Sequence, residues 1–183
     1  MRSTEEVLTK DCLLKISRMG MLGLVGYMED EGFFVSPAST RFHLSVPGGL
    51  AVHSWGVYLT FRELLTKFDL EEQISEESMM LVSFLHDLCK AGAYIREGER
   101  YRWNGNHPSG HAKLSLEKIK KFIVLTKQEE DIIKYHMGFY GAKEFSQYGE
   151  YSLIELAQNW NENKLGKLFH IADELSTHWG EKA

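Results

Sequence analysis

Several side chains that can bind metals fall on the apolar faces of expected helices. Each follows an apolar residue at helical spacing, namely His53 after Leu50, His86 after Val82, His136 after Ile132 and Asp173 after Phe169. Burying a carboxylate or an imidazole costs several kcal/mol unless the group is paired, hydrogen-bonded or coordinated. A shared metal ion would satisfy all of these groups at once, although each histidine alone could also be a core residue with ordinary hydrogen bonds.

Three short motifs surround these residues. They are GGLAVHS at 48–54, FLHDLCK at 84–90 and HIAD at 170–173, with 33 residues from His53 to His86 and 86 from Asp87 to Asp173. Together they resemble the H…HD…D signature of the HD-domain metal-dependent phosphohydrolases, over roughly residues 36–178. The resemblance implies that His53, His86, Asp87 and Asp173 ligate a metal.

Two more histidines match an extended form of this signature. His111 follows Asp87 by 24 residues, and His136 follows 25 residues later. The order H…HD…H…H…D resembles the HD phosphodiesterases and the bacterial single-strand exonucleases that use two metals. By that resemblance His111 and His136 are ligands too, and Asp87 bridges two ions. The segment SPASTRFH at 36–43 is also similar to phage-type and gut-bacterial HD proteins.

The reaction that this resemblance implies is hydrolysis of a phosphate ester in a nucleotide, a cyclic nucleotide or a short oligonucleotide. One or two divalent ions would be the cofactor, and the ligand types fit Mn, Fe, Co, Ni, Zn or Mg. Asp87 would also orient the nucleophile. Lys90 shares a helix face with His86 and Asp87 and could reach a phosphate, or it could be a surface lysine near a helix end. Arg41 could bind phosphate with both guanidinium nitrogens, or it could pack within its loop.

Two other classes of function stay open. HD-fold diiron oxygenases use the same six ligand types, so the ligand set does not exclude them. A non-catalytic module that holds a nucleotide without turnover is the other alternative. Aromatic residues of the segment 94–103 could stack on bases or could simply cover the bundle.

The elements that carry these residues are nearly all helices. An amphipathic helix is expected over about 4–19, with a capping box at Ser3-x-x-Glu6, followed by a long glycine-punctuated loop from Gly20 to Gly49. Helical spacing predicts further helices over about 50–68 and 76–89, from Pro108 onward, and over 165–178. Two more helices are expected to begin at the capping boxes Thr126-x-x-Glu129 and Ser152-x-x-Glu155. Alternating residues over 94–103 predict a small β-hairpin. The expected fold is an all-α HD-domain bundle, one domain over 1–183, with the N-terminal helix packed on a core of about 36–178.

Composition narrows the class of partner. The chain has 183 residues, 21 Lys and Arg against 26 Asp and Glu, 8 His and a net charge of −5. No basic run could follow a long phosphate backbone, so a small phosphorylated substrate, a nucleotide above all, fits better than duplex DNA. Cys12 and Cys89 lie in apolar helical patterns, which indicates buried free thiols. Apolar stretches are shorter than the roughly 18 residues of a membrane span, and the N-terminus does not read as a signal peptide, so we expect a cytoplasmic protein with no membrane partner.

Overall fold

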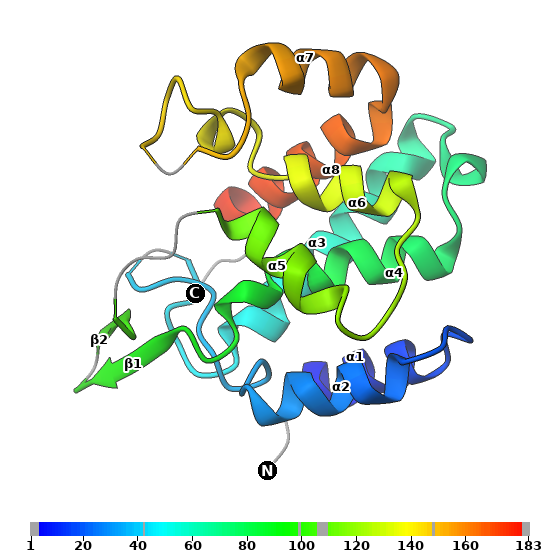
Figure 1. Cartoon of the computed structure of the whole chain (residues 1–183). Coiled ribbons are helices and arrows are strands. Elements are labelled where there is room, and N and C mark those ends of the chain that lie inside the picture. The colour runs from blue at the N-terminus through cyan, green and yellow to red at the C-terminus, as the bar shows by residue number, and fades with distance from the viewer. Residues whose placement is uncertain (1–3, 42, 99, 106–109, 148, 181–183) are drawn as a thin grey trace.

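The computed structural model describes residues 4–41, 43–98, 100–105, 110–147 and 149–180, which form a helical bundle with one small sheet (Figure 1). The α-helices are α1 (Thr4–Leu14), α2 (Met21–Asp30), α3 (Gly49–Lys67), α4 (Glu76–Leu85), α5 (His111–Ile119), α6 (Lys127–Tyr135), α7 (Leu153–Glu162) and α8 (Lys164–Leu175). The shorter elements are the 3₁₀ turns η1 (Glu71–Gln73), η2 (Leu88–Lys90) and η3 (Gly138–Gly141), the π-helical η4 (Ser176–Gly180), and the strands β1 (Tyr94–Glu97) and β2 (Arg100–Trp103). The predicted all-α bundle with a hairpin is confirmed.

Helix α3 runs through the centre of the bundle and packs against α1, α4 and α8. Its residues Leu50, Val57, Phe61 and Leu65 recur on one side and are at most 1% exposed. They belong to one apolar cluster that extends from α1 to α8. This continuous packing fixes the helices that carry the candidate ligands relative to one another. Neither α3 nor any other helix in the described part of the chain has the length and apolar character to cross a bilayer.

The segment between residues 20 and 49 contains a helix that the sequence pattern did not predict. Helix α2 occupies its first third and buries Met21, Leu24, Val25 and Met28. Glycine lowers helix propensity by about 1 kcal/mol, and burial of these four apolar residues outweighs that cost. Gly20 has φ 92, and a Cβ there would lie 1.9 Å from the carbonyl oxygen of Phe122, so the glycine permits a close approach of two backbones. The described residues 31–41 and 43–48 are irregular, as predicted. Helix α1 ends at Leu14, earlier than expected, and Ser3 of its predicted capping box lies outside the described residues.

Helix α4 leads into the His86–Asp87 pair and ends there, whereas the sequence pattern predicted a helix that continues to Cys89. His86 caps α4 with helical dihedral angles, whereas Asp87 has φ −106 and ψ 22. The chain then tightens into η2, where the N–H of Lys90 donates to the carbonyl of Asp87. The N–H of Cys89 donates to Oγ of Ser115 in α5, so a side chain of another helix replaces the missing helical acceptor.

The predicted hairpin is present and has the register Tyr94 opposite Trp103 and Glu97 opposite Arg100. It projects from the side of the bundle where η2 and α5 lie (Figure 1). The rings of Tyr94 and Trp103 pack with centroids 4.5 Å apart, and the ring of Trp103 lies 5.6 Å from that of His111. The hairpin therefore borders the start of α5.

Two of the three predicted capping boxes form in the described residues, at the starts of α6 and α7. In α6, Glu129 also accepts two hydrogen bonds from the guanidinium of Arg18, at 2.9 and 3.0 Å. The Glu129 side chain is fully buried. Burial alone would raise the pKa of Glu129, but hydrogen bonds from Arg18 and from the backbone of Thr126 hold it below its ordinary value. This ion pair anchors α6, the helix that ends at His136, to the N-terminal part of the chain.

Candidate metal centre

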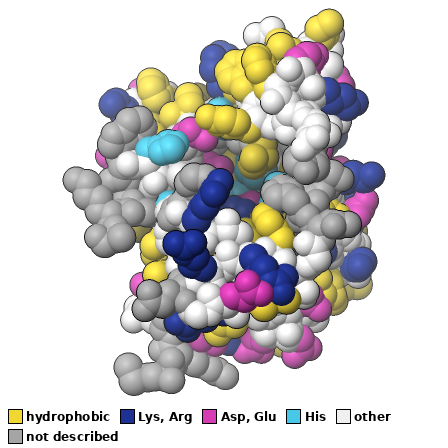
Figure 2. Space-filling view, turned by 90° about the vertical axis from the view of Figure 1, so that its left-hand side faces the viewer, with side chains coloured by type: hydrophobic (Ala, Val, Ile, Leu, Met, Phe, Trp, Pro, Cys, Tyr) yellow, Lys and Arg dark blue, Asp and Glu magenta, His cyan; other side chains and the backbone are white. Residues whose placement is uncertain are grey.

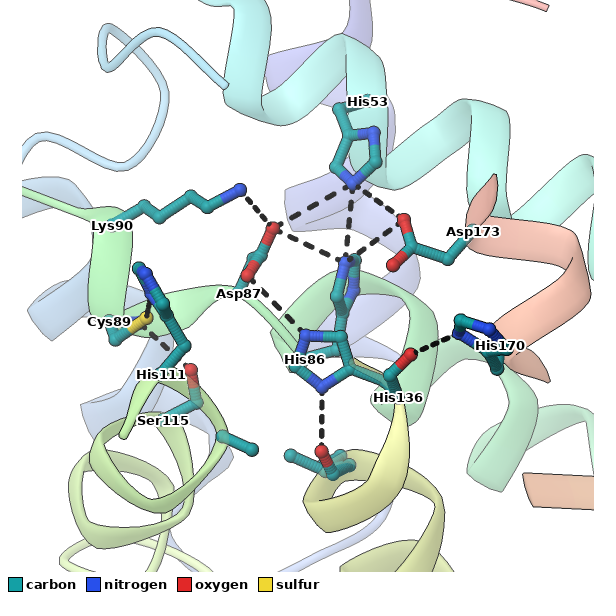
Figure 3. A network of polar contacts seen from close by, with 12 residues as sticks. His53, His86, Asp87, Cys89, Lys90, His111, Ser115, His136, His170 and Asp173 are labelled. Atoms are coloured by element: carbon teal, nitrogen blue, oxygen red, sulfur yellow. Dashed lines mark hydrogen bonds and ion pairs between the residues drawn. The ribbon is translucent and has the colours of Figure 1, made fainter. Parts of the chain in front are cut away.

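Five side chains with metal-binding chemistry converge where α3, α4, α6 and α8 meet (Figure 3). His53 comes from α3, His86 and Asp87 from the end of α4, His136 from the end of α6 and Asp173 from α8. All but Asp173 are at most 3% exposed. Residues that are far apart in the sequence thus meet in one buried polar cluster, and together with nearby residues they form groups that could hold a metal ion.

His53, His86 and Asp173 form the inner group of this cluster. Nε2 of His53 lies 3.3 Å from Nε2 of His86 and 3.2 Å from Oδ1 of Asp173. Oδ2 of Asp87 faces the same atoms, 3.7 Å from His53 Nε2 and 3.5 Å from His86 Nε2. Donor atoms bound to one first-row cation are separated by roughly 3 to 3.5 Å, because each metal–ligand bond is about 2.1 Å long. The spacing of the inner group therefore suits a single ion.

The ring orientations of His86 and His136 direct a lone pair into the cluster. Nδ1 of His86 lies 2.9 Å from the carbonyl oxygen of Ser83, and Nδ1 of His136 lies 2.7 Å from that of Ile133. A carbonyl oxygen only accepts hydrogen bonds, so each Nδ1 carries a proton. In the neutral ring Nε2 then presents its lone pair to the centre of the cluster, which is the arrangement that metal-ligating histidines adopt.

Asp87 links the inner group to the rest of the cluster, because its two oxygens face different neighbours. Oδ1 lies 3.7 Å from Nε2 of His136, too far for a hydrogen bond. Neither of these two buried atoms has a hydrogen-bond partner among the described residues. With Nε2 of His136 unprotonated, two acceptor atoms face each other in a low-dielectric interior, and either a proton on that ring or a metal ion between the two atoms removes this cost.

Charge around Asp87 also favours a cation. Burial alone would raise the pKa of Asp87, yet the positive charge of Lys90 holds it well below its ordinary value. Burial likewise works to lower the pKa of His136, and the Asp87 carboxylate raises it instead. The pKa of Asp173 is also lowered, since hydrogen bonding to His53 outweighs the effect of burial. The local field therefore favours positive charge beside two ionised carboxylates.

An outer group consists of Asp87, Cys89 and His111, with one donor atom of each within 4.8 Å of the others. Sγ of Cys89 lies 3.3 Å from Nδ1 of His111. Burial raises the pKa of the Cys89 thiol to about 12, and the charge of Asp87 adds to this effect. Among the described residues, no group of this spacing contains both His111 and His136. Instead His136 groups with His86 and Asp87, so the two predicted ligands lie on different sides of Asp87.

The remaining predicted site residues are Lys90, which contacts the cluster, and Arg41, which lies in an exposed position. Nζ of Lys90 lies 2.6 Å from Oδ2 of Asp87, with the lysine side chain 16% exposed, so this residue reaches the cluster as expected. Its interaction with Asp87 outweighs burial and raises its pKa. Arg41 is exposed in the irregular segment before α3, and its contact with phosphate stays a prediction.

Three residues near the centre were assigned no metal or catalytic role from the sequence. The ring of His43 packs 5.2 Å from that of His53, and Nδ1 of His170 donates to the carbonyl of His136 at 2.7 Å. The third is Cys89 in the outer group. Neither His43 nor His170 has a sequence spacing that relates it to the ligand it touches. For Cys89, the offset of two from Asp87 carried no signal, because in a continuous helix such residues face different sides.

Comparison of the chain with protein-family models, with curated proteins and with solved structures finds no match. The resemblance of the motifs to HD-domain proteins therefore has no independent support, and the function rests on the chemistry of this cluster.

Proposed function

We propose that this protein is a metal-dependent phosphohydrolase of the HD type, which cleaves a phosphate ester bond in a nucleotide, a cyclic nucleotide or a short oligonucleotide. One observation carries the proposal. Three buried imidazoles and two carboxylates, drawn from four helices, face one another with unshared donor atoms at Asp87 Oδ1 and His136 Nε2. Such an arrangement would be unfavourable without a cation and suits one or two divalent ions.

The residues present fit that cofactor. His53, His86 and Asp173 would hold one ion together with Asp87, and His136 groups with His86 and Asp87 on that side. Asp87 with His111 would serve a second ion on its other side. Divalent ions in such sites supply a hydroxide nucleophile at neutral pH and neutralise charge on phosphoryl oxygens. The carbonyls of Ser83 and Ile133 fix the rings of His86 and His136, so these ligands are oriented before a metal binds.

Lys90 is the residue best placed to meet a phosphate. Its ammonium contacts the edge of the cluster at Asp87 Oδ2, and this carboxylate keeps the lysine charged despite burial. A small rotation would exchange the carboxylate oxygen for a phosphoryl oxygen without loss of charge pairing. Asp87 would then be free to orient the attacking oxygen.

The surface beside the outer group supports an aromatic substrate such as a nucleotide. A cavity of about 320 Å³ opens next to His111 and is lined by Met137, Tyr140 and Phe145. Its volume is enough for a small planar ring, and aromatic walls stack on bases. Figure 2 looks onto the side from which the hairpin projects, and basic side chains stand near the middle of that face. The hairpin contributes exposed Arg96, Arg100 and Arg102, which would attract phosphate.

The proposal is tested by hydrolysis assays on the purified chain loaded with Mn²⁺, with nucleoside monophosphates, cyclic nucleotides and short single-stranded oligonucleotides as substrates. His86→Ala and Asp87→Ala are expected to abolish phosphate release. His178, which is exposed and pairs with Glu174, and Asp131, which is partly buried and pairs with Lys127, provide matched controls. His178→Ala and Asp131→Asn should leave hydrolysis unchanged.

Two results would contradict the proposal. Activity retained in both cluster variants would show that the cluster is not the active site. Stoichiometric metal binding with no hydrolysis of any substrate would instead favour a diiron oxygenase or a non-catalytic nucleotide-binding module. Further assays distinguish these two. An oxygenase would consume dioxygen in the iron-loaded form, whereas a binding module would retain nucleotide unchanged.

A further inference from the structure

Cys89 has surroundings that are unusual for a structural thiol. It is 5% exposed and lies two residues after Asp87, in the 3₁₀ turn η2. Its sulfur contacts Nδ1 of His111 at 3.3 Å and belongs with Asp87 and His111 to one group of potential ligand atoms (Figure 3). A buried thiol in a protein core is normally surrounded by apolar groups, whereas this sulfur faces an imidazole and a carboxylate.

The position of the sulfur follows from the break in the chain after α4. Had α4 continued, residues 87 and 89 would point to different sides of the helix. The irregular dihedral angles of Asp87 and the following 3₁₀ turn bring both side chains to one side. The hydrogen bond from the Cys89 N–H to Oγ of Ser115 then fixes this turn against α5, whose first residue is His111.

The spacing of the outer group agrees with coordination. Zn–S bonds are about 2.3 Å and Zn–N bonds about 2.1 Å, so sulfur and nitrogen on one tetrahedral ion lie roughly 3.6 Å apart. The observed distance from Cys89 Sγ to His111 Nδ1 is 3.3 Å. The independent sign of a ligand is the buried Oδ1 of Asp87, which has no hydrogen-bond partner among the described residues.

We propose that Cys89 supplies a sulfur ligand to the second cation, together with Asp87 and His111. This inference rests on the metal centre of the proposed function and adds a donor that the H…HD…H…H…D pattern does not contain. A cation displaces the proton of a thiol that it binds, so the neutral thiol becomes a thiolate on loading. Sulfur is a soft donor, and the second position should therefore prefer Zn²⁺, Co²⁺ or Fe²⁺ to Mg²⁺ or Mn²⁺.

Cobalt provides a readout that does not depend on activity. Cobalt bound to a thiolate shows a sulfur-to-metal charge-transfer band in the near ultraviolet, and nitrogen or oxygen ligands give no such band. The full-length protein is titrated with Co²⁺ while absorbance and bound metal are measured. We expect the band to grow with the second equivalent of cobalt, because the inner group lacks sulfur.

Two cysteine variants give a matched comparison. Cys12 is half-buried in α1 and belongs to none of the potential ligand groups found among the described residues. Cys12→Ser should leave the band unchanged, and Cys89→Ser should remove it and weaken the second equivalent at least tenfold. If Cys89→Ser does not fold, X-ray absorption of zinc-loaded Cys12→Ser protein answers the same question, since one sulfur scatterer at about 2.3 Å is expected.

The outcomes separate this inference from the proposed function. Two bound metals with no charge-transfer band and no sulfur scatterer would overturn the sulfur ligand and leave the phosphohydrolase proposal intact. A band that persists in Cys89→Ser and disappears in Cys12→Ser would also overturn it. Failure of the protein to bind any metal would contradict both proposals together.

Discussion

The inner group, which Asp87 contacts, and the outer group, which contains Asp87, are built in different ways. The inner group comes from the body of α3, the end of α4 and the body of α8, helices that pack directly against one another. The outer group comes from a 3₁₀ turn and the first residue of α5, and its histidine is half-buried beside an open cavity. The hydrophobic core thus fixes the positions of the inner donor atoms. The positions of the outer donor atoms depend on the turn η2 and on the start of α5.

This difference divides the work of the centre. A rigid, buried group holds a cation tightly, because its ligands are ordered before binding. A group at the cavity wall is the part that a substrate can reach. We therefore expect the inner position to govern whether the centre assembles, and the outer position to govern catalysis and metal preference.

The largest effects are expected when one proposed ligand of each group is substituted. Asp173→Asn should lower kcat by about 1000-fold or more, because loss of the inner ion removes several kcal/mol of charge stabilisation. His111→Ala should lower kcat by about 100-fold and leave one bound metal per chain. Metal content and steady-state kinetics of both variants check this. Equal losses of metal in the two variants would show that the groups do not differ.

Thermal stability should also show that the inner position governs assembly of the centre. Metal at 100 times its dissociation constant stabilises a folded protein by about 2.7 kcal/mol, which corresponds to about 5 to 10 °C in Tm at this chain length. We expect calorimetry to show that the first equivalent gives most of this increase and that a chelator reverses it. An Asp173→Asn protein should lose the increase, and an increase of the same size in that variant would count against the inner position.

The anchor of α6 tests whether the cluster depends on packing far from it. Glu129→Gln should reduce the free energy of unfolding by about 1.5 to 3 kcal/mol at neutral pH, because a buried charged pair with Arg18 is lost. The pKa of Glu129 is lowered in the folded protein, so the unfolded chain binds its proton more readily. The stabilisation is therefore complete well above pH 4.5, the ordinary pKa, and fades as pH falls through the lower folded value. Urea unfolding across pH should show the two proteins converging in acid, and a constant difference would refute the assignment.

The smallest expected effect concerns the support of His136. A Cβ on Gly138 would lie 2.4 Å from the ring of His170, which donates to the carbonyl of His136. Gly138→Ala should displace His170 and weaken metal binding about tenfold, as loss of ligand support does. Gly98 also has a positive φ, with nothing within 4 Å of an added Cβ, so Gly98→Ala carries the same backbone strain without the displacement. Equal metal affinity in both variants would show that His170 does not position His136.

The sequence predicted the helical class, the hairpin and the capping boxes of α6 and α7, because these depend on local spacing and on short-range hydrogen bonds. It missed α2, where Gly20, Gly23 and Gly26 suggested a loop. What decides that segment is the packing of Gly20 and Gly23 against Phe122, a contact between distant parts of the chain. Propensity cannot reveal such a contact.

For the candidate site, residue type and helical spacing found the members of the inner group and His136. The sequence could not predict that His111 and His136 belong to different groups. This separation depends on where α4 ends and how α5 begins. Cys89 illustrates the limit. A regular helix would turn it away from Asp87, and only the break at Asp87, supported by Ser115 from another helix, brings its sulfur to His111.

The contact between Lys90 and Asp87 sets an order of events for the proposed reaction. With both carboxylates ionised, Asp87, Asp173 and the Lys90 ammonium together carry one negative charge, which repels a phosphate. Each divalent ion adds two positive charges, so loading reverses the sign of the pocket. Bound cations would then raise the affinity for phosphate, and by thermodynamic linkage bound phosphate would raise the affinity for the cations by the same factor. Substrate and metal would retain each other, and cellular metal supply would act as the switch that admits substrate.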